Sequence, residues 1–178
     1  MLYMFLENGF EETEALATLD FIRRGGIEIR LVSEFEVVCG SHGIKVLRDI
    51  SFEEAAFDGL LGVILPGGQP GSDNLKKNEK VKKYLEYCYE NNLLICAICA
   101  APYILGELGY LKGLKATSYP DYQVALTGAE ISDKKAVRDK NIITAKGMGA
   151  SFDFGYEIVK YLKDEELAKN IKESIFAD

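Results

Sequence analysis

The sequence predicts a single α/β domain over residues 1–178, in which a mostly parallel sheet is covered by helices on both faces. Two observations predict this class. Short runs that are apolar throughout, such as residues 93–98, alternate with helical segments, and strands buried on both faces have this composition. The chain has 178 residues, enough for one sizeable core, and it contains no internal repeat, low-complexity tract or linker.

The expected strands and helices follow from hydrophobic periodicity and from the residues that end each segment. In the first half of the chain we expect a strand at 2–6, a helix at 11–24 ended by Gly25-Gly26, a strand at 27–32, a hairpin at 36–47 and a strand at 60–65. In the second half we expect a helix at 76–90, a strand at 93–98, a helix at 100–108, a hairpin of 136–137 with 142–145, and helices at 151–162 and 165–175. Pro102 falls in a first helical turn, where proline is tolerated.

Charge and hydropathy argue against two classes of binding partner, nucleic acids and membranes. The formal net charge is −7, and no block of lysine and arginine is present, so we expect no nucleic-acid partner. No run approaches the length of a membrane span, and the apolar start at residues 1–6 is too short for the core of a signal peptide. The composition therefore predicts a cytoplasmic protein that does not bind membranes.

The cysteines and the single histidine limit the chemistry. The four cysteines, Cys39, Cys88, Cys96 and Cys99, are expected to be reduced thiols in this context. Only one CxxC spacing occurs, and His42 is the single histidine, so we expect no metal site. His42 lies in a glycine-flanked turn, where a solvated side chain is expected.

Cys99 is the strongest candidate for a reactive residue. It stands between a buried strand and a helix that must begin at once, and such a turn aims a side chain over the edge of the sheet. A thiol at a helix N-terminus has a lowered pKa, so we expect a substantial thiolate fraction at neutral pH. The alternative for Cys99 is a small buried core residue. A redox dithiol with Cys96 is disfavoured, because Cys96 lies inside the strand and would have to break strand pairing to reach Cys99.

Two further segments leave a predicted strand at the edge where ligands bind. The loop Gly67-Gly68-Gln69-Pro70-Gly71 lacks the Lys-Ser/Thr of a P-loop. It is either a tight turn or a place where backbone N–H groups approach a developing oxyanion. Glu11, Glu12 and Glu14 are either favourable charges in the first turn of a helix or a source of one catalytic carboxylate, and helical phase does not choose between them.

Five motifs in order resemble one known family. They are the segments 9–15 (GFEETEA), 23–27 (RRGGI), 63–68 (VILPGG), 97–102 (AICAAP) and 146–152 (KGMGASF). With them the sequence resembles the ThiJ/PfpI superfamily, in particular the branch of the parkinsonism-associated protein and its bacterial relatives. The resemblance implies a flavodoxin-like three-layer sandwich, similar to class I glutamine amidotransferases, that forms a homodimer and needs no cofactor.

The same resemblance assigns roles to residues. It implies that Cys99 is the nucleophile, that Glu14 is the carboxylate hydrogen-bonded to its sulfur, and that backbone N–H groups of Gly67, Gly68 and Ala100 lie nearby. Two positions depart from the family. The protease-named branch has a histidine directly after the nucleophile, where this chain has Ala100, so peptidase activity is not expected. A family histidine before a proline is replaced by Tyr119, a candidate for substrate contact but a poor base at neutral pH.

Two functions are consistent with these residues. In the first, the Cys99 thiolate adds to an α-oxoaldehyde such as methylglyoxal, or acts on its adducts, and Glu14 relays the proton, as in a glyoxalase or deglycase. In the second, Cys99 is oxidised to a sulfinate and the protein acts as an oxidative-stress sensor or chaperone without efficient catalysis.

Overall fold

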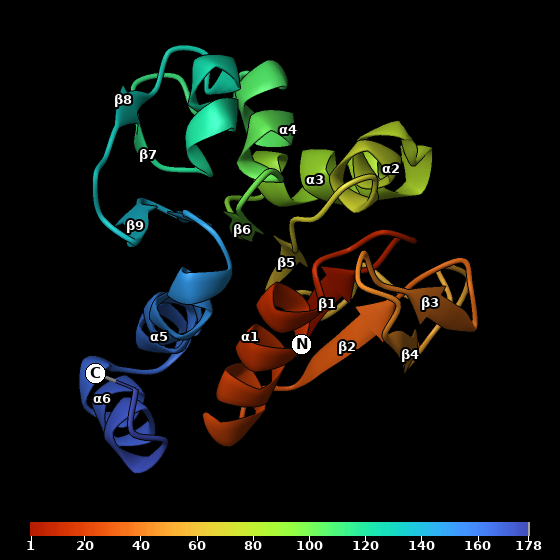
Figure 1. Ribbon diagram of the computed structural model, residues 1–178, viewed down its shortest axis with the longest axis horizontal. Helices are drawn as coiled ribbons and strands as arrows, with labels where there is room; N and C mark the ends of the chain where they lie inside the picture. The colour runs from red at the N-terminus through yellow and green to blue at the C-terminus, as the bar shows by residue number, and fades with distance from the viewer. Residues whose placement is uncertain (178) are drawn as a thin grey trace.

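A six-stranded sheet forms the middle layer of the molecule in a computed structural model that describes residues 1–177 (Figure 1). The strands lie in the order β2 (Ile29–Val32), β1 (Leu2–Phe5), β5 (Gly62–Leu65), β6 (Leu94–Ile98), β10 (Ile142–Ala145) and β9 (Ala136–Asp139). Neighbouring strands are parallel except for β9, which pairs antiparallel with β10 at one edge. The mostly parallel sheet expected from the sequence is therefore confirmed.

Helices cover both faces of this sheet (Figure 1). One face carries α1 (Glu12–Arg24), α5 (Ser151–Leu162) and α6 (Glu165–Ser174), with α5 packed between the other two. The opposite face carries α2 (Gly71–Lys77), α3 (Glu79–Glu90) and α4 (Pro102–Glu107). This is the predicted three-layer sandwich. None of the helices within residues 1–177 has the length and apolar composition needed to cross a lipid bilayer.

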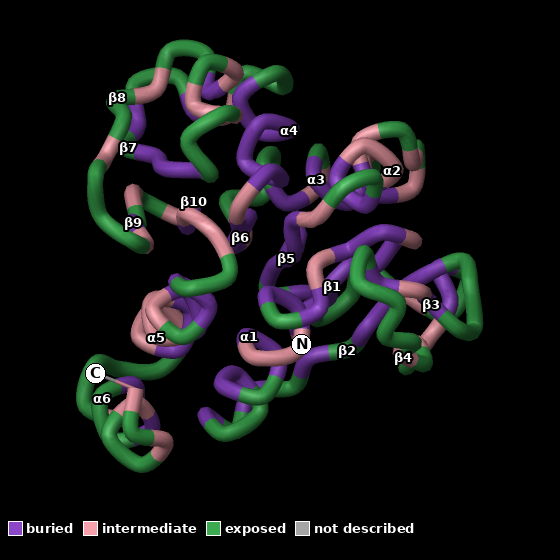
Figure 2. The backbone as a smooth tube through the Cα atoms, viewed as in Figure 1, coloured by how far each residue is buried: buried purple, intermediate pink, exposed green. Residues whose placement is uncertain are grey.

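Side chains of the central strands alternate between two buried clusters, one under each helical layer. In β1, Met4 belongs to the cluster beneath α1 and α5, whereas Tyr3 and Phe5 belong to the cluster beneath α3 and α4. Every residue of β1, β5, β6 and β10 is buried, and the purple tube of β5 shows this in the middle of the sheet (Figure 2). Burial on both faces explains why these strands read as uninterrupted apolar runs.

The structure departs from the expected elements in the second quarter of the chain. The helix expected at 76–90 is two helices, α2 and α3, with Asn78 between them. Asn78 caps α3, because its side chain accepts hydrogen bonds from the backbone N–H groups of Lys80 and Val81. The expected hairpin at 36–47 is confirmed as β3 (Val37–Cys39) and β4 (Lys45–Leu47).

Several short elements were not expected from the sequence. They are β7 (Lys115–Ala116), β8 (Glu130–Ile131), and the 3-10 helices η1 (Pro120–Ala125) and η2 (Met148–Ala150). Segments of two to six residues are too short to show a hydrophobic period.

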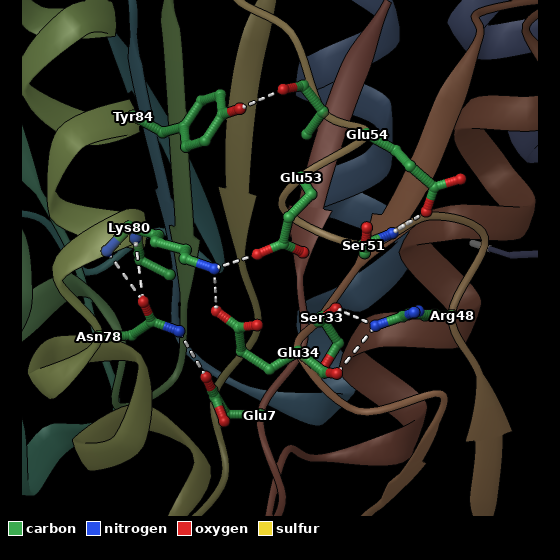
Figure 3. Close-up of polar contacts among 12 residues, drawn as sticks. Glu7, Ser33, Glu34, Arg48, Ser51, Glu53, Glu54, Asn78, Lys80 and Tyr84 are labelled. Atoms are coloured by element: carbon green, nitrogen blue, oxygen red, sulfur yellow. Dashed lines mark hydrogen bonds and ion pairs between the residues drawn. The ribbon is translucent and has the colours of Figure 1, made fainter.

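A polar network ties the start of α3 to the loops beyond β1 and β2 (Figure 3). The Asn78 side chain donates to Glu7 at 2.7 Å, and Lys80 pairs with Glu34 at 2.8 Å. Burial raises the pKa of Glu7, and its bond from Asn78 opposes that effect. Tyr84 donates its hydroxyl proton to the carbonyl of Ala55 at 2.9 Å. These contacts fix α3 on the sheet.

Candidate active site

Cys99 lies where β6 ends, in a backbone conformation that few residues other than glycine adopt. Its φ is 64°. Two backbone hydrogen bonds hold it there: its N–H donates to the carbonyl of Ala145 at 2.9 Å, and its own carbonyl accepts from Tyr119 N–H at 2.8 Å. A strained conformation fixed from both sides is common at reactive residues. The strand-to-helix turn expected at Cys99 is present, but the helix expected at 100–108 spans Pro102–Glu107 and does not begin directly after the cysteine.

Glu14 reaches Cys99 from the first turn of α1. Glu14 is only 1% exposed to solvent. One carboxyl oxygen, Oε2, accepts the backbone N–H of Gly67 at 2.9 Å, whereas Oε1 has no hydrogen-bond donor in good geometry within residues 1–177. A Cβ atom at Gly67 would lie 2.5 Å from both Cys99 Cβ and Glu14 Oε2. Glycine at this position therefore lets the carboxyl and the thiol-bearing turn pack together.

The structure distinguishes the three glutamates, which helical phase did not. Glu11 caps α1, because its side chain accepts the backbone N–H of Glu14 at 2.6 Å. Glu12 points to the loop between β3 and β4, where it accepts the backbone N–H groups of His42 at 2.7 Å and Ile44 at 3.4 Å. Glu14 is the one that interacts with the Cys99 thiol.

His42 is exposed as expected, but its side chain is also bound. Nδ1 lies 2.9 Å from Glu12 Oε2, and the hydrogen bond and charge of Glu12 raise the pKa of the imidazole. Burial raises the pKa of Glu12, but bonds from His42, its own backbone and Ile44 outweigh burial and lower the value to about 2. Glu11, Glu12 and His42 offer ligand atoms within 4.8 Å of one another. Glu12 already accepts hydrogen bonds through both oxygens, so this cluster serves to fix the loop.

The pKa values of the thiol and the carboxyl are both raised. Burial raises the pKa of Glu14 to about 7, against the lowering influence of the Cys99 thiol and of the backbone N–H groups of Gly67 and Met148. Burial, followed by the negative charge of Glu14, raises the pKa of Cys99 to about 12. Between these values the pair holds a single proton, for which the sulfur and the carboxyl compete.

The lowered thiol pKa expected from the sequence is therefore wrong for this arrangement. The backbone N–H groups of Ala100 and Gly68 do lower the pKa of Cys99, but burial and Glu14 outweigh them. The helix dipole adds little, because α4 begins only at Pro102 and has six residues. Any thiolate at Cys99 depends on Glu14 taking the proton.

The three backbone groups named by the resemblance have two different partners. The N–H groups of Gly68 and Ala100 face the Cys99 sulfur, whereas that of Gly67 is engaged by Glu14. Gly68 has a φ of +91°, and a Cβ there would lie 2.4 Å from the backbone nitrogen of Glu11. Gly67 thus orients the carboxyl, and Gly68 allows the loop to pass beside α1.

A pocket of about 750 Å³ opens above this pair. Cys99, Glu14 and Tyr119 line it, so three side chains predicted from the sequence are brought together. The pocket is completed by His42, for which only a solvated turn was expected, and by residues not expected at the site, among them Lys135, Lys146 and Gly147. A Cβ at Gly147 would lie 3.8 Å from both Cys99 Sγ and Glu14 Oε1. The presence of residues 146–147 in the last motif was the one signal that could have indicated them.

The four cysteines are free thiols, as expected. Cys96 is fully buried within β6, and burial raises its pKa well above the ordinary value. A thiol in this state is a poor partner for redox exchange with Cys99.

Comparison with known proteins finds relatives over nearly the full length of the chain. Residues 1–161 match the model of the DJ-1/PfpI family. The chain is 32% identical to Protein dj-1beta of Drosophila melanogaster, over 97% of this chain and 94% of the relative. It is 31% identical to the Deglycase PfpI of Pyrococcus furiosus, over 92% of this chain and 100% of the relative.

Solved structures of similar proteins have the same fold. The crystal structure of Drosophila melanogaster DJ-1beta superposes with a TM-score of 0.92 at 31% identity, covering 99% of this chain and 97% of that one. Toxoplasma gondii DJ-1, described as oxidized, gives a TM-score of 0.93 at 26% identity, covering 98% and 97% of the two chains. The chain belongs to the DJ-1/PfpI family.

Proposed function

We propose that this protein converts α-oxoaldehydes such as methylglyoxal, or their adducts with amines and thiols, through Cys99 with Glu14 as the proton relay. The observation that carries the proposal is a buried carboxyl, with a pKa of about 7, beside a thiol that lines a pocket. A group with that pKa accepts and releases protons near neutral pH. The similarity to a relative named a deglycase supports the same class of substrate.

The first step is addition to the aldehyde. The Cys99 sulfur forms a bond to the aldehyde carbon, and its proton passes to Glu14, which has one carboxyl oxygen without a donor within residues 1–177. The N–H groups of Gly68 and Ala100 lie beside the sulfur, where they can stabilise the negative charge that develops on the aldehyde oxygen. Glu14 then returns the proton to that oxygen, which gives a hemithioacetal.

The second stage moves one proton between neighbouring carbons. Glu14 removes the proton from the former aldehyde carbon and returns it to the adjacent carbon through an enediol, while the hydroxyl proton passes from the oxygen of the first carbon to that of the second. The product is a thioester of lactate. Water hydrolyses the thioester and restores the thiol. One water is consumed, and oxidation of one carbon balances reduction of its neighbour, so no external oxidant is needed. Tyr119 also lines the pocket, and in this proposal its hydroxyl donates a hydrogen bond to a substrate oxygen.

The direct test is formation of lactate from methylglyoxal without added glutathione. Wild type is expected to form lactate, and Cys99→Ser and Glu14→Gln to lose activity by about a hundredfold or more, in the range of a removed nucleophile or general base. Full activity in Cys99→Ser would refute the proposal, as would absence of lactate with the wild type.

We also propose that the protein is a homodimer. The β3–β4 hairpin carries three exposed apolar side chains, Val37, Ile44 and Leu47, which are 47%, 53% and 64% exposed. Apolar side chains gathered on one hairpin are more typical of an interface than of a free surface. Sedimentation should give a dimer that Leu47→Glu converts to monomer. A monomeric wild type would refute this.

A second function, redox sensing, has one observation in its favour. Of the cysteines, Cys88 and Cys96 are buried in the core, whereas Cys99 lines an open pocket. A Cys99 sulfinate could accept the proton of Glu14 as a hydrogen bond. Mass spectrometry after mild peroxide should then show a gain of two oxygens at Cys99 before any gain at Cys39. If Cys99 does not gain oxygen first, this role is excluded.

A further inference from the structure

Two lysines extend the reactive edge of the sheet beyond Cys99. In the parallel pairing of β6 with β10, Ile98 lies opposite Ala145, so the next residues along the strands, Cys99 and Lys146, are neighbours. Lys146 in turn donates its backbone N–H to the carbonyl of Lys135 at 2.9 Å, which places Lys135 beside it at the start of β9. Cys99, Lys146 and Lys135 therefore stand in a row across three strands.

Neighbouring strands lie about 4.8 Å apart, so the two lysine backbones are about 5 and about 10 Å from that of Cys99. Both lysines line the pocket that contains the thiol. Flexible ammonium groups at these positions can meet a substrate group a few bonds away from the carbon that the sulfur attacks.

The charges of these lysines are poorly compensated within residues 1–177. Lys146 has no ion-pair partner there, and Lys135 has one distant contact, with Asp153 at 3.9 Å. Asp153 is bound more closely by Lys172, at 2.9 Å. Like charges directly opposite each other on paired strands repel. An anion between Lys135 and Lys146 would relieve this repulsion.

The other charged groups around the pocket do not offset the lysines. The carboxylate of Glu12 is bound by the imidazole and the backbone N–H of His42, on the loop between β3 and β4. Glu11 caps α1, and its carboxylate lies within 4.8 Å of Glu12 and His42, on the α1 side of the pocket. Glu14 is nearly uncharged below neutral pH, because burial raises its pKa to about 7. The lysine side is therefore the electropositive part of the pocket.

The pocket is also larger than a free oxoaldehyde requires. A water molecule occupies about 30 Å³ of liquid, so the five heavy atoms of methylglyoxal fill on the order of 150 Å³. The pocket has about 750 Å³. A substrate several times larger than methylglyoxal fits it.

We propose that the substrate of this site is an adduct of a reactive carbonyl that carries a carboxylate, and that Lys135 and Lys146 bind this carboxylate. This substrate class rests on the proposed function for the reaction at Cys99. The recognition of the anion is a separate property of the pocket, and it can be measured on the thiol without any turnover.

The first experiment compares iodoacetate with iodoacetamide as alkylating agents of Cys99. The two reagents form the same kind of thioether bond and release iodide, but one carries a carboxylate and the other a neutral amide. The rate ratio at Cys99, relative to the ratio at Cys39 in the same molecule, measures attraction of the anion. Mass spectrometry of the two cysteine peptides gives both ratios.

We expect the relative ratio at Cys99 to favour iodoacetate in the wild type and to fall about fivefold in Lys135→Gln/Lys146→Gln, as two partly exposed charge contacts would give. Added salt should reduce the wild-type ratio. Lys134→Gln is the matched control, because Lys134 is an exposed neighbour that does not line the pocket. An equal ratio in wild type and double variant would overturn anion binding.

The second experiment uses hemithioacetals of methylglyoxal with N-acetylcysteine and with its neutral amide. We expect a higher kcat/KM for the carboxylate substrate, and a ratio of the two constants that falls several-fold in the double variant but not in Lys134→Gln. A wild type that turns over both substrates equally would overturn the substrate class. If neither substrate is turned over while the alkylation ratio responds as expected, the proposed reaction fails and the anion site stands.

Discussion

The backbone N–H of Gly67 donates to Glu14 Oε2 at 2.9 Å, which fixes one oxygen of a buried carboxyl and leaves Oε1 without a donor within residues 1–177. An unpaired buried acceptor is costly for a folded protein, by about 1–3 kcal/mol. The cost falls when that oxygen carries a proton or meets the Cys99 thiol. The arrangement suits a carboxyl that exchanges a proton with the sulfur.

Replacement of Glu14 by glutamine should stabilise the protein at neutral pH. Burial raises the pKa of Glu14 from 4.5 to about 7, so the folded state holds the proton more tightly than the unfolded chain. This contribution to stability is complete below pH 4.5 and is lost as the pH rises through about 7. A permanently neutral Glu14→Gln should gain stability over wild type across this range, up to about 3 kcal/mol. Urea unfolding at several pH values measures it.

Glu166→Gln is the control, because Glu166 is an exposed carboxylate of α6 and should show no comparable gain. A Glu14→Gln variant that is less stable than wild type above neutral pH would show that burial of the ionised Glu14 carboxylate does not destabilise the folded protein.

The rate of the proposed reaction should rise with pH through about 7. The pair must lose its first proton before the sulfur can attack while Glu14 accepts a proton, and burial places that loss at about 7. Values of kcat/KM measured from mildly acidic to mildly alkaline pH should increase and then level off. A profile that is flat, or that falls across this range, would contradict Glu14 as the base.

Alanine at Gly67 should disrupt the site, whereas alanine at Gly147 should be tolerated by the fold. A Cβ at Gly67 would lie 2.5 Å from Cys99 Cβ and Glu14 Oε2, so Gly67→Ala should cost about 1–3 kcal/mol and most of the activity. The atoms nearest to a Cβ at Gly147 are 3.7 and 3.8 Å away, which is ordinary contact. Thermal unfolding of both variants tests this, and equal stability would show that the Gly67 site can relax.

Glu12 should hold the loop between β3 and β4 in place. Its carboxylate accepts the backbone N–H groups of His42 and Ile44, so Glu12→Ala should speed hydrogen exchange of these two amides about tenfold or more. The loss of hydrogen bonds to a charged acceptor should also cost about 2 kcal/mol of stability. Glu36→Ala, an exposed change just before β3, is the control. Unchanged exchange at both amides would show that contacts other than those of Glu12 hold the loop in place.

The sheet and most helices could be predicted because burial leaves a clear pattern in the sequence. The apolar run at 93–98 corresponds to β6, and the periodic segment 151–162 corresponds to α5 without change. The break at Asn78 was missed, because a capping residue inside a charged segment looks like one more exposed helical position. The short elements around η1 depend on tertiary contacts such as those of η1 with α4.

The candidate site could be predicted only in part. The end of an apolar strand just before a helix predicted the place of Cys99, but the choice of Glu14 among three glutamates depends on Gly67, which is 53 residues away. The raised thiol pKa also could not be read from the chain, because it arises from burial and from that same carboxyl. Lys135 and Lys146 reach the pocket through strand pairing at the end of the sheet, and apart from the place of Lys146 in the last motif their own segments give no sign of this.

The central claim is that Cys99 forms a covalent adduct whose further conversion needs Glu14. The most direct measurement is mass spectrometry of Glu14→Gln and wild type after exposure to methylglyoxal. On long exposure we predict that slow addition without the help of Glu14 places one methylglyoxal on Cys99 of the variant, with little lactate, whereas wild type forms lactate and retains little adduct. Lactate formation by Glu14→Gln at the wild-type rate, or an adduct found on other cysteines but never on Cys99, would contradict the account.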